Sequence, residues 1–312
     1  RWVLRNREIS CQPEQVAIVS GYGQALDLIA RIHCGPTDVV AMEDPTYPPG
    51  RELFESHGTS ILSVPVDAQG LRVDQLTSGP RSPAPKVLLV TPAHQFPMGS
   101  ILTMQRRLDL LNWAQRVKCL VLEDDYDAEF NFEGRPVPAL SALVHNGTAL
   151  YLSSFKKILP PPFDLDFMII PEQLVPIYAQ ALRLSSGQIS TPIQSALAGF
   201  MAAGELEKQV RRLRTMYGKR RKALLAAIDR YLGAKAELTA DNVGLHVIIR
   251  IKSKLSDNQL VERAAQSGVE LVSTGSFYSV DPGNTGAFVL GYATLSEAEI
   301  DDGVKRLSRL LK

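Results

Sequence analysis

The chain has 312 residues, of which 45% are hydrophobic and 21% are charged, and its formal net charge is +1. This length and composition predict a globular protein with one large and one smaller domain, and the charge gives no indication of a nucleic-acid or acidic-membrane partner. The three cysteines, Cys11, Cys34 and Cys119, have no zinc-site spacing, so no metal is expected. No signal peptide or bilayer-spanning apolar segment is present, which predicts a cytoplasmic protein without a membrane partner.

The N-terminal part of the chain predicts alternating strands and helices. After a polar lead-in at residues 1–13, a strand at 16–19 leads into the turn Ser20-Gly-Tyr-Gly-Gln24 and a helix at 25–32. A small-residue turn that opens a helix offers free backbone N–H groups and a positive dipole end, which suits a phosphate. A plain strand-to-helix turn is the alternative interpretation of the same pattern.

Further strands are expected at 38–43, 61–64 and 86–90, and helices at 51–57 and 103–117, whereas residues 67–85 are polar and predict an exposed connection. Two of these strands end in polar motifs that contain an aromatic ring, Asp44-Pro-Thr-Tyr47 and Thr91-Pro-Ala-His94. A packed loop aromatic is the alternative for Tyr47, and a structural histidine is the alternative for His94.

The stretch from 118 to 171 carries most of the chemistry. The apolar run 119–122 ends in Glu123-Asp-Asp-Tyr-Asp127, the run 149–152 ends in Ser153-Ser-Phe-Lys-Lys157, and a third run covers 167–170. Short apolar runs bounded by polar turns are typical of buried strands in a parallel sheet. Ligands of such sheets bind beyond the carboxyl ends of the strands, and here those ends carry carboxylates, a phenol and two lysines.

The last third predicts a linking helix and a small α+β domain. One long helix is expected at 204–232, where a basic cluster is interpreted as a solvated helix face rather than a nucleic-acid surface. Strands at 244–249, 269–272 and 288–292 and helices at 257–267 and 296–311 are then expected. The domains are accordingly placed at 1–203 (large, cofactor-binding) and 204–312 (linking helix and small C-terminal domain).

An acid at one strand end, a tyrosine two residues later and a lysine about thirty residues further on suggest pyridoxal phosphate. Lysine can form a Schiff base with an aldehyde, and a buried carboxylate can keep a pyridine nitrogen protonated. Glu123-Asp-Asp-Tyr-Asp-Ala-Glu-Phe130 and Tyr151-Leu-Ser-Ser-Phe-Lys-Lys157 resemble the acidic and lysine motifs of the aminotransferase-like domain of MocR regulators, a branch of the GntR transcription factors. Thr91-Pro-Ala-His-Gln-Phe-Pro-Met-Gly99 is similar to another loop of that family, and the resemblance covers nearly the whole chain.

This resemblance implies roles for individual residues. Asp124 would face the pyridine nitrogen, Tyr126 the ring hydroxyl, and Lys157 would form the Schiff base, with Lys156 as the rival lysine. The remaining cofactor-binding residues implied by the resemblance are Tyr22, Gly23, Tyr47, His94 and Ser154.

The chain departs from the family at the phosphate end of the site. Asp164 stands where the family has a phosphate-binding arginine, and Asp166 replaces a glycine. An aspartate repels a phosphate dianion, whereas an arginine gives it bidentate charge-assisted bonds. Phosphate binding would then depend on the helix N-terminus at 22–23, on Ser154 and on Lys156.

The resemblance implies a fold-type I transferase, with a mostly parallel sheet covered by helices on both faces and a small C-terminal α+β domain, assembled as a homodimer. The function expected is that of an effector-sensing domain of a MocR-type transcriptional regulator, regulatory rather than an efficient transaminase. Because the first residue is arginine, a fragment is expected, with DNA bound through an N-terminal winged helix outside this chain. The effector would be a small molecule such as an amine or amino acid. Two alternatives stay open: a stand-alone aminotransferase, or a domain that has lost the cofactor and binds another ligand.

Overall fold

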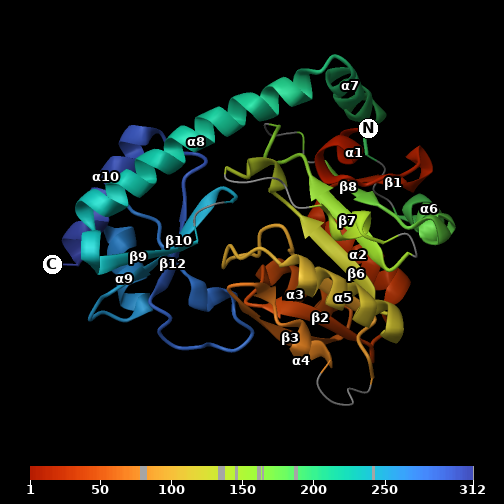
Figure 1. Cartoon of the computed structure of the whole chain (residues 1–312), viewed down its shortest axis with the longest axis horizontal. Helices are drawn as coiled ribbons and strands as arrows, with labels where there is room; N and C mark the ends of the chain where they lie inside the picture. The colour runs from red at the N-terminus through yellow and green to blue at the C-terminus, as the bar shows by residue number, and fades with distance from the viewer. Residues whose placement is uncertain are drawn as a thin grey trace. The chain divides into compact units, whose positions relative to one another are not determined.

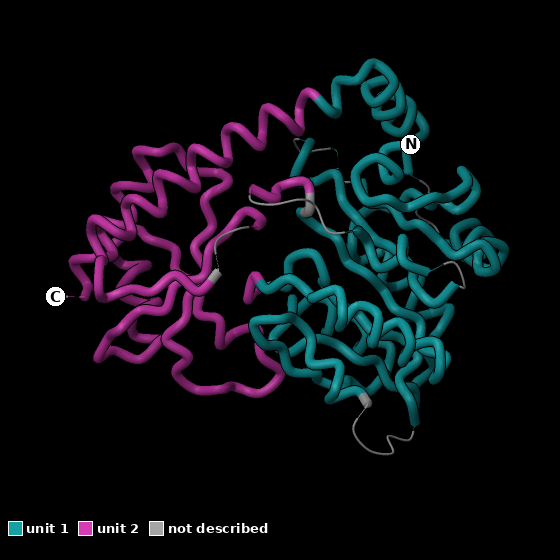
Figure 2. Tube along the Cα trace, viewed as in Figure 1, with its two compact units in different colours: residues 1–96, 100–128, 135–207 teal, residues 97–99, 129–134, 208–312 magenta. Residues whose placement is uncertain are grey.

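The computed structural model describes residues 1–77, 83–132, 138–144, 147–159, 163, 165–185, 189–240 and 243–311. The chain forms two compact units (Figure 2). Unit 1 comprises residues 1–96, 100–128 and 135–207, and unit 2 comprises residues 97–99, 129–134 and 208–312. The domain boundary expected at residue 203 stays a prediction. Among the described helices, none combines the length and apolar character needed to cross a membrane.

Unit 1 is built on an eight-stranded sheet with the strand order β1-β8-β7-β6-β5-β2-β3-β4 (Figure 1). The five strands from β7 to β3 pair in parallel, while β8 is antiparallel to both β1 and β7, and β4 is antiparallel to β3. The strands are β1 (Val16–Val19), β2 (Val39–Asp44), β3 (Ser60–Asp67), β4 (Gly70–Leu71), β5 (Val87–Val90), β6 (Leu120–Asp125), β7 (Ala149–Ser154) and β8 (Asp166–Ile169).

The mostly parallel sheet expected from the sequence is confirmed, but the direction of its last apolar run was predicted wrongly. That run forms β8, which lies antiparallel to its neighbours. The reason is the short segment 155–165 between β7 and β8, because a parallel crossover needs about a dozen residues or more, usually with a helix. The antiparallel direction brings the start of β8, rather than its end, to the edge where the parallel strands finish.

Helices cover both faces of this sheet. Side chains alternate between the two faces along each strand, so the buried strands supply apolar side chains to a core on each face. On one face, Val40 and Met42 of β2 pack in a core that includes Leu26 and Phe54; on the other, Ala41 packs in a core that includes Leu110. The helices of unit 1 are α1 (Trp2–Arg7), α2 (Tyr22–His33), α3 (Pro48–Ser56), α4 (Val73–Thr77), α5 (Met104–Val117), α6 (Val175–Leu184) and α7 (Thr191–Ala202). The long helix α8 (Glu205–Tyr231) begins at the end of unit 1 and lies mostly in unit 2.

Two segments for which the sequence predicted no helix or strand, one of them expected to be exposed, contribute to the core. The polar lead-in forms α1 and buries Trp2 and Val3, and the expected exposed connection forms β4 and α4, where Leu71 and Leu76 are buried. Both segments hold only a few apolar residues among many polar ones. Such short patterns lack a clear period, so only packing against the rest of unit 1 decides their structure.

Unit 2 contains a smaller, fully antiparallel sheet with the order β11-β12-β10-β9. Helices α9 and α10 both begin with a capping box, in which Ser256 and Ser296 accept from the third backbone N–H of the helix. The strand β9 was not predicted. The elements are β9 (Ala236–Ala240), β10 (His246–Ile251), α9 (Asp257–Gln266), β11 (Val272–Ser273), β12 (Ala287–Gly291) and α10 (Glu297–Leu310).

The core of unit 1 predicts the effect of truncating a central strand. Leu122 of β6 is fully buried, so Leu122→Ala should lower the free energy of unfolding by about 3 kcal/mol, measured by urea denaturation. Leu184→Ala is the control, because the Leu184 side chain is 79% exposed and its truncation should change stability by less than about 0.5 kcal/mol. Equal losses in both variants would contradict the assignment of Leu122 to the core.

Candidate functional site

The predicted site residues all belong to unit 1, and most lie where its strands finish. Asp124 is the second-to-last residue of β6, Ser154 is the last residue of β7, and His94 lies in the loop after β5. The pairing registers place these ends side by side, since Asp125 is opposite Ser153 and Ser154 is opposite Asp166. The sheet therefore carries carboxylates, hydroxyls and aromatic rings on one edge.

The N-terminus of α2 lies at this edge directly after β1. Its N-cap residue Gly21 has a φ of 98°, a left-handed conformation that favours glycine. Gly23, in the first turn, is exposed, and a Cβ atom at its position would meet nothing within 4 Å. Ser20 binds the Gln24 side chain through both its N–H and its hydroxyl, at 2.7 and 3.0 Å. The first turn of α2 is thus open at Gly23, and phosphate binding there stays a prediction.

Asp124 is a buried carboxyl group at the edge with a perturbed pKa. Burial raises its pKa well above the usual range, and nearby acidic groups raise it further, namely Asp125, Asp166, Asp127 and Glu43. Tyr22 reaches the same carboxyl group, since burial and its hydrogen bond and charge interaction with Asp124 raise the pKa of the phenol. A Cβ atom on Gly50 of α3 would lie 2.9 Å from the Tyr22 hydroxyl, so glycine allows this approach. A cation beside Asp124 would relieve the accumulated negative charge.

His94, Tyr126 and Asp127 form a compact group beside Asp124. Nδ1 of His94 lies 2.9 Å from the Tyr126 hydroxyl and 3.0 Å from Oδ2 of Asp127, and the two rings stack at 5.7 Å. The imidazole is 3% exposed, and burial together with the nearby carboxylates raises the pKa of Tyr126. The structure therefore joins two predicted residues, His94 and Tyr126, and adds Asp127, which was not predicted as a site residue.

The loop that carries His94 is fixed by buried polar groups of β2 and α5 and by its own Gln95. Glu43 at the end of β2 accepts from the backbone N–H and hydroxyl of Thr91, at 3.0 and 2.5 Å. Gln95 donates to the carbonyl oxygen of Pro45 at 2.8 Å. From α5, the fully buried Arg107 donates to the carbonyl oxygen of Pro92 at 2.6 Å, and burial lowers its pKa to about 10. His94 consequently stands on a rigid support.

Aromatic rings line the edge from α2 to β6. Tyr47, 46% exposed, meets Tyr22 edge-on at 5.9 Å and Phe96 at 5.7 Å, and Phe96 meets Tyr126 at 6.2 Å. The structure thus brings the predicted residues Tyr22, Tyr47 and Tyr126 into one row through Phe96. The sequence offered one signal for Phe96, its place two residues after His94 in a loop that resembles a family motif.

The side chains of Ser154 and Lys157 form no hydrogen bond with the other predicted site residues that the structure describes. The Ser154 hydroxyl donates to Oδ1 of Asp166, and its oxygen accepts from the backbone N–H of Lys156 at 3.1 Å. Lys157 is exposed in the turn after β7, and its side chain makes no hydrogen bond or ion pair to any other residue that the structure describes. Ser154 is therefore committed to Asp166, and the amine of Lys157 is not joined to the other predicted residues. Asp164 lies outside the described residues.

Arg7 is a further part of the edge that the sequence gave no sign of. Its guanidinium lies 2.5 Å from Oδ2 of Asp125, and the two side chains are 5% and 2% exposed. The Tyr151 hydroxyl donates to the same oxygen at 2.6 Å. Burial raises the pKa of Asp125, while Arg7 and Tyr151 lower it. The carboxyl group of Asp125, next to Asp124, is thus paired with a residue of α1 that lies 118 positions earlier in the chain. No local sequence pattern reveals a contact over such a separation.

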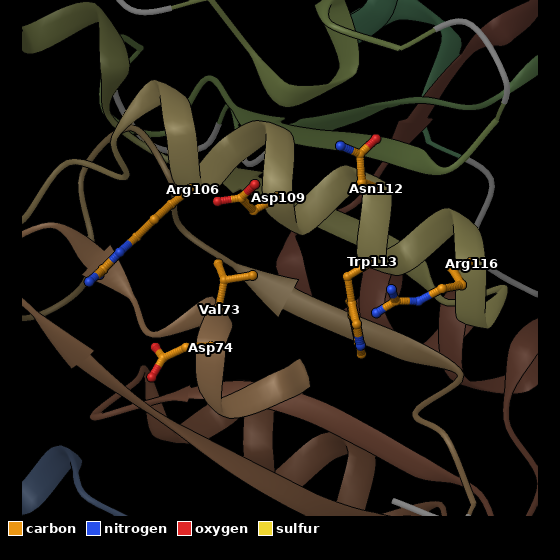
Figure 3. Close-up of a pocket in the computed structure, with 7 residues that line it drawn as sticks. All are labelled: Val73, Asp74, Arg106, Asp109, Asn112, Trp113 and Arg116. Carbon is orange, nitrogen blue, oxygen red and sulfur yellow. The ribbon is translucent and has the colours of Figure 1, made fainter. Parts of the chain in front are cut away.

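A hollow on another part of unit 1 is lined by several charged side chains, two of which form ion pairs (Figure 3). It is lined by residues of α4 and α5, where Arg106 binds Asp67 at 2.6 and 2.7 Å and Asp109 accepts from Gln105 at 3.0 Å. Asp74 pairs with Arg72 at 2.6 Å. None of the predicted site residues lines it, so the edge described above is the candidate site.

Comparison with known proteins identifies the family. The family described as aminotransferase class I and II matches residues 1–307. The chain belongs to this family. It is 32% identical over 311 residues to the uncharacterized HTH-type transcriptional regulator YdeL of Bacillus subtilis, a match that covers 100% of this chain and 66% of that protein. It is also 32% identical over 306 residues to the probable rhizopine catabolism regulatory protein MocR of Rhizobium meliloti, covering 98% and 61% of the two chains.

Solved structures agree with this assignment. The kynurenine aminotransferase of Pyrococcus horikoshii, solved in complex with PMP and kynurenine, is 28% identical and superposes with a TM-score of 0.87 over 99% of this chain and 78% of its own. The fold-type I architecture and the resemblance to MocR-type regulators expected from the sequence are confirmed. The chain spans slightly under two thirds of the length of the two regulators.

Glu43 gives the site a predicted pH dependence. Burial raises its pKa from 4.5 to about 7, so the folded protein retains a proton that the unfolded chain releases. Stability from this group is therefore present below pH 4.5 and is lost as the pH rises through 7, by about 3 kcal/mol in total. Urea unfolding of Glu43→Gln should show a flatter decline with pH than the wild type. Glu52→Gln, on the exposed side of α3, is the matched control and should follow the wild type.

The ion pair of α1 gives a second prediction. Arg7→Met leaves the Asp125 carboxyl group buried without its cation, and the free energy of unfolding should fall by about 3 kcal/mol. Arg5→Met on the same helix removes an exposed pair with Glu207 and should cost less than about 1 kcal/mol. Thermal or urea unfolding of both variants tests this difference. Similar losses in the free energy of unfolding would contradict a larger stabilisation by the buried Arg7 pair.

Proposed function

We propose that this chain is the effector-sensing, aminotransferase-like domain of a MocR-type transcriptional regulator, and that it holds pyridoxal phosphate at the candidate site with Lys157 as the attachment point. The observation that carries the proposal is the buried Asp124 carboxyl group, surrounded by acidic groups and reached by the Tyr22 hydroxyl. Such a group suits a protonated pyridine nitrogen. The regulators YdeL and MocR among the relatives of this chain support the regulatory assignment.

The residues fit the ring end of this cofactor. When bound, pyridoxal phosphate supplies an aldehyde that condenses with primary amines with loss of water, and a ring that withdraws electrons. Asp124 would keep the ring nitrogen protonated, because a pyridinium cation offsets the charge that the neighbouring carboxylates concentrate there. Tyr126 and His94 would bind the ring hydroxyl from their fixed positions, and Tyr47 and Phe96 would limit access of water.

At the opposite end, the first turn of α2 with Tyr22 and Gly23 would receive the phosphate. Ser154 reaches this region only by giving up its bond to Asp166. Lys157, exposed at the end of β7, would supply the primary amine. The phosphate would thus be held less firmly than the ring. A domain that binds the cofactor loosely suits sensing better than rapid transamination, which needs Lys157 aligned as the proton carrier.

As a sensor, the domain would respond to a small-molecule amine or amino acid, since such a compound competes with Lys157 for the aldehyde. Binding would shift the population of conformations and pass the change to a DNA-binding domain outside this chain. The proposal includes a homodimer in the cytoplasm. Full-length protein whose DNA binding responds to the effector equally well with and without Lys157 would contradict it.

The second candidate is a stand-alone aminotransferase, favoured by the likeness to the solved kynurenine aminotransferase. Steady-state assays with amino-acid donors and a 2-oxo acid separate the two, since the enzyme requires multiple turnovers and the sensor does not. The third, a domain that has lost the cofactor and binds another ligand in the same place, predicts no reaction with pyridoxal phosphate at all.

The attachment point is tested with purified protein mixed with pyridoxal phosphate and reduced with borohydride. Lys157→Ala should abolish the visible absorbance band and the mass increase of the reduced protein, because it removes the amine that reacts. Lys156→Ala is the matched control, one residue earlier in the same exposed turn, and should retain both signals. Peptide mapping that finds the adduct on Lys156, or an unmodified wild type, would sink the assignment of Lys157.

A further inference from the structure

One carboxylate lies between the two segments that would receive the phosphate. Asp166 is the first residue of β8, and it pairs with Val19 of β1 on one side and with Ser154 of β7 on the other. Helix α2 begins at Tyr22, three residues after Val19. Because β8 runs antiparallel to both neighbours, its first residue stands at the edge where β1 and β7 end. Asp166 is therefore flanked by the start of α2 and by the end of β7.

Asp166 also accepts the hydrogen bond that the Ser154 hydroxyl would otherwise donate to a phosphate. Its side chain belongs to a residue only 2% exposed, and its Oδ1 accepts the hydrogen bond of the Ser154 hydroxyl. Ser154 has a single hydroxyl proton, and its oxygen already accepts from the backbone N–H of Lys156 at 3.1 Å. A phosphate at this position would find an acceptor in place of a donor.

Charge acts in the same direction as hydrogen bonding. A phosphate monoester carries close to two negative charges at neutral pH, and a carboxylate in a buried place repels it more strongly than one in water. The field of Asp166 extends into the site, since it is one of the groups that raise the pKa of Asp124. The carboxylate that leaves the ring end suited to a cation thus makes the other end unsuited to a dianion.

We infer that Asp166 sets the specificity of this site against the phosphate group, so that the site accepts an unphosphorylated pyridoxal-type aldehyde at least as well as pyridoxal phosphate. The hydroxymethyl group of such a compound carries one O–H donor and no charge, and it would donate to Asp166. This inference rests on the proposed function, because it requires an aldehyde held at Lys157.

The test measures dissociation constants of the 312-residue chain for pyridoxal phosphate, pyridoxal and 5-deoxypyridoxal by titration calorimetry. The wild type should bind pyridoxal at least as tightly as pyridoxal phosphate, bind 5-deoxypyridoxal more weakly than pyridoxal, and show no competition from millimolar inorganic phosphate. In Asp166→Asn, which keeps the side-chain shape, affinity for pyridoxal phosphate should rise by at least about tenfold while affinity for pyridoxal does not rise. Comparing variants for each ligand cancels differences in free aldehyde between ligands. For the comparisons between ligands on the wild type, each constant is expressed per concentration of free aldehyde, because pyridoxal closes to an internal hemiacetal.

Asp109→Asn on α5 is the matched control, because it removes the same charge from an exposed residue away from the edge and should leave all three constants unchanged. Asp166→Gly provides a second variant if Asp166→Asn does not fold, and the wild-type measurements stand without either.

Borohydride trapping with mass analysis, run alongside, distinguishes the two ways of failing. A wild type that binds pyridoxal phosphate about tenfold more tightly than pyridoxal, with the adduct on Lys157, overturns the role of Asp166 and leaves the proposed function standing. Equal gains for both aldehydes in Asp166→Asn have the same meaning. Absence of any adduct on Lys157 with all three aldehydes and all variants overturns both.

Discussion

Burial of carboxylates at one edge of the large sheet is the constraint on which unit 1 depends. Three of the buried carboxylates accept hydrogen bonds from segments far away in the chain. Glu43 accepts from the loop after β5, and Glu123 accepts from the backbone N–H groups of Leu140 and Ser141. Asp125 binds Arg7 of α1 and Tyr151 of β7. Because a buried charge without partners costs several kcal/mol, these segments are held against the edge. The same bonds that satisfy the carboxylates therefore position the loop of His94 and the end of β7.

This arrangement gives the two ends of the candidate site opposite characters. At the ring end, the acidic groups around Asp124 raise its pKa and favour a neighbouring cation. At the other end, the open first turn of α2 favours an anion, while Asp166 opposes one and occupies the hydroxyl of Ser154. In the function proposed above, such a site would hold a ring more firmly than a phosphate.

The family assignment identifies the fold, whereas the ligand depends on the side chains of the site. Aminotransferase class I and II proteins share this fold whether their names describe regulators or transaminases, as the relatives and the solved structure illustrate. Fold alone does not determine function. In the further inference drawn above, the side chains at the sheet edge, and Asp166 in particular, would decide what the common scaffold can hold.

The sequence by itself determined the alternation of strands and helices along most of unit 1, the long helix α8 and the family, because apolar runs and motifs such as the one ending at Lys157 are local signals. It also placed Asp124, Tyr126 and His94 at strand ends. It singled out Asp166 as a departure from the family, but it did not determine the bond of Asp166 to Ser154, the direction of β8, the burial of α1, or the partners Arg7 and Phe96. Those were decided by tertiary structure, because strand direction depends on connection length, and a buried charge or ring acquires its role only from neighbours that lie far away in the chain.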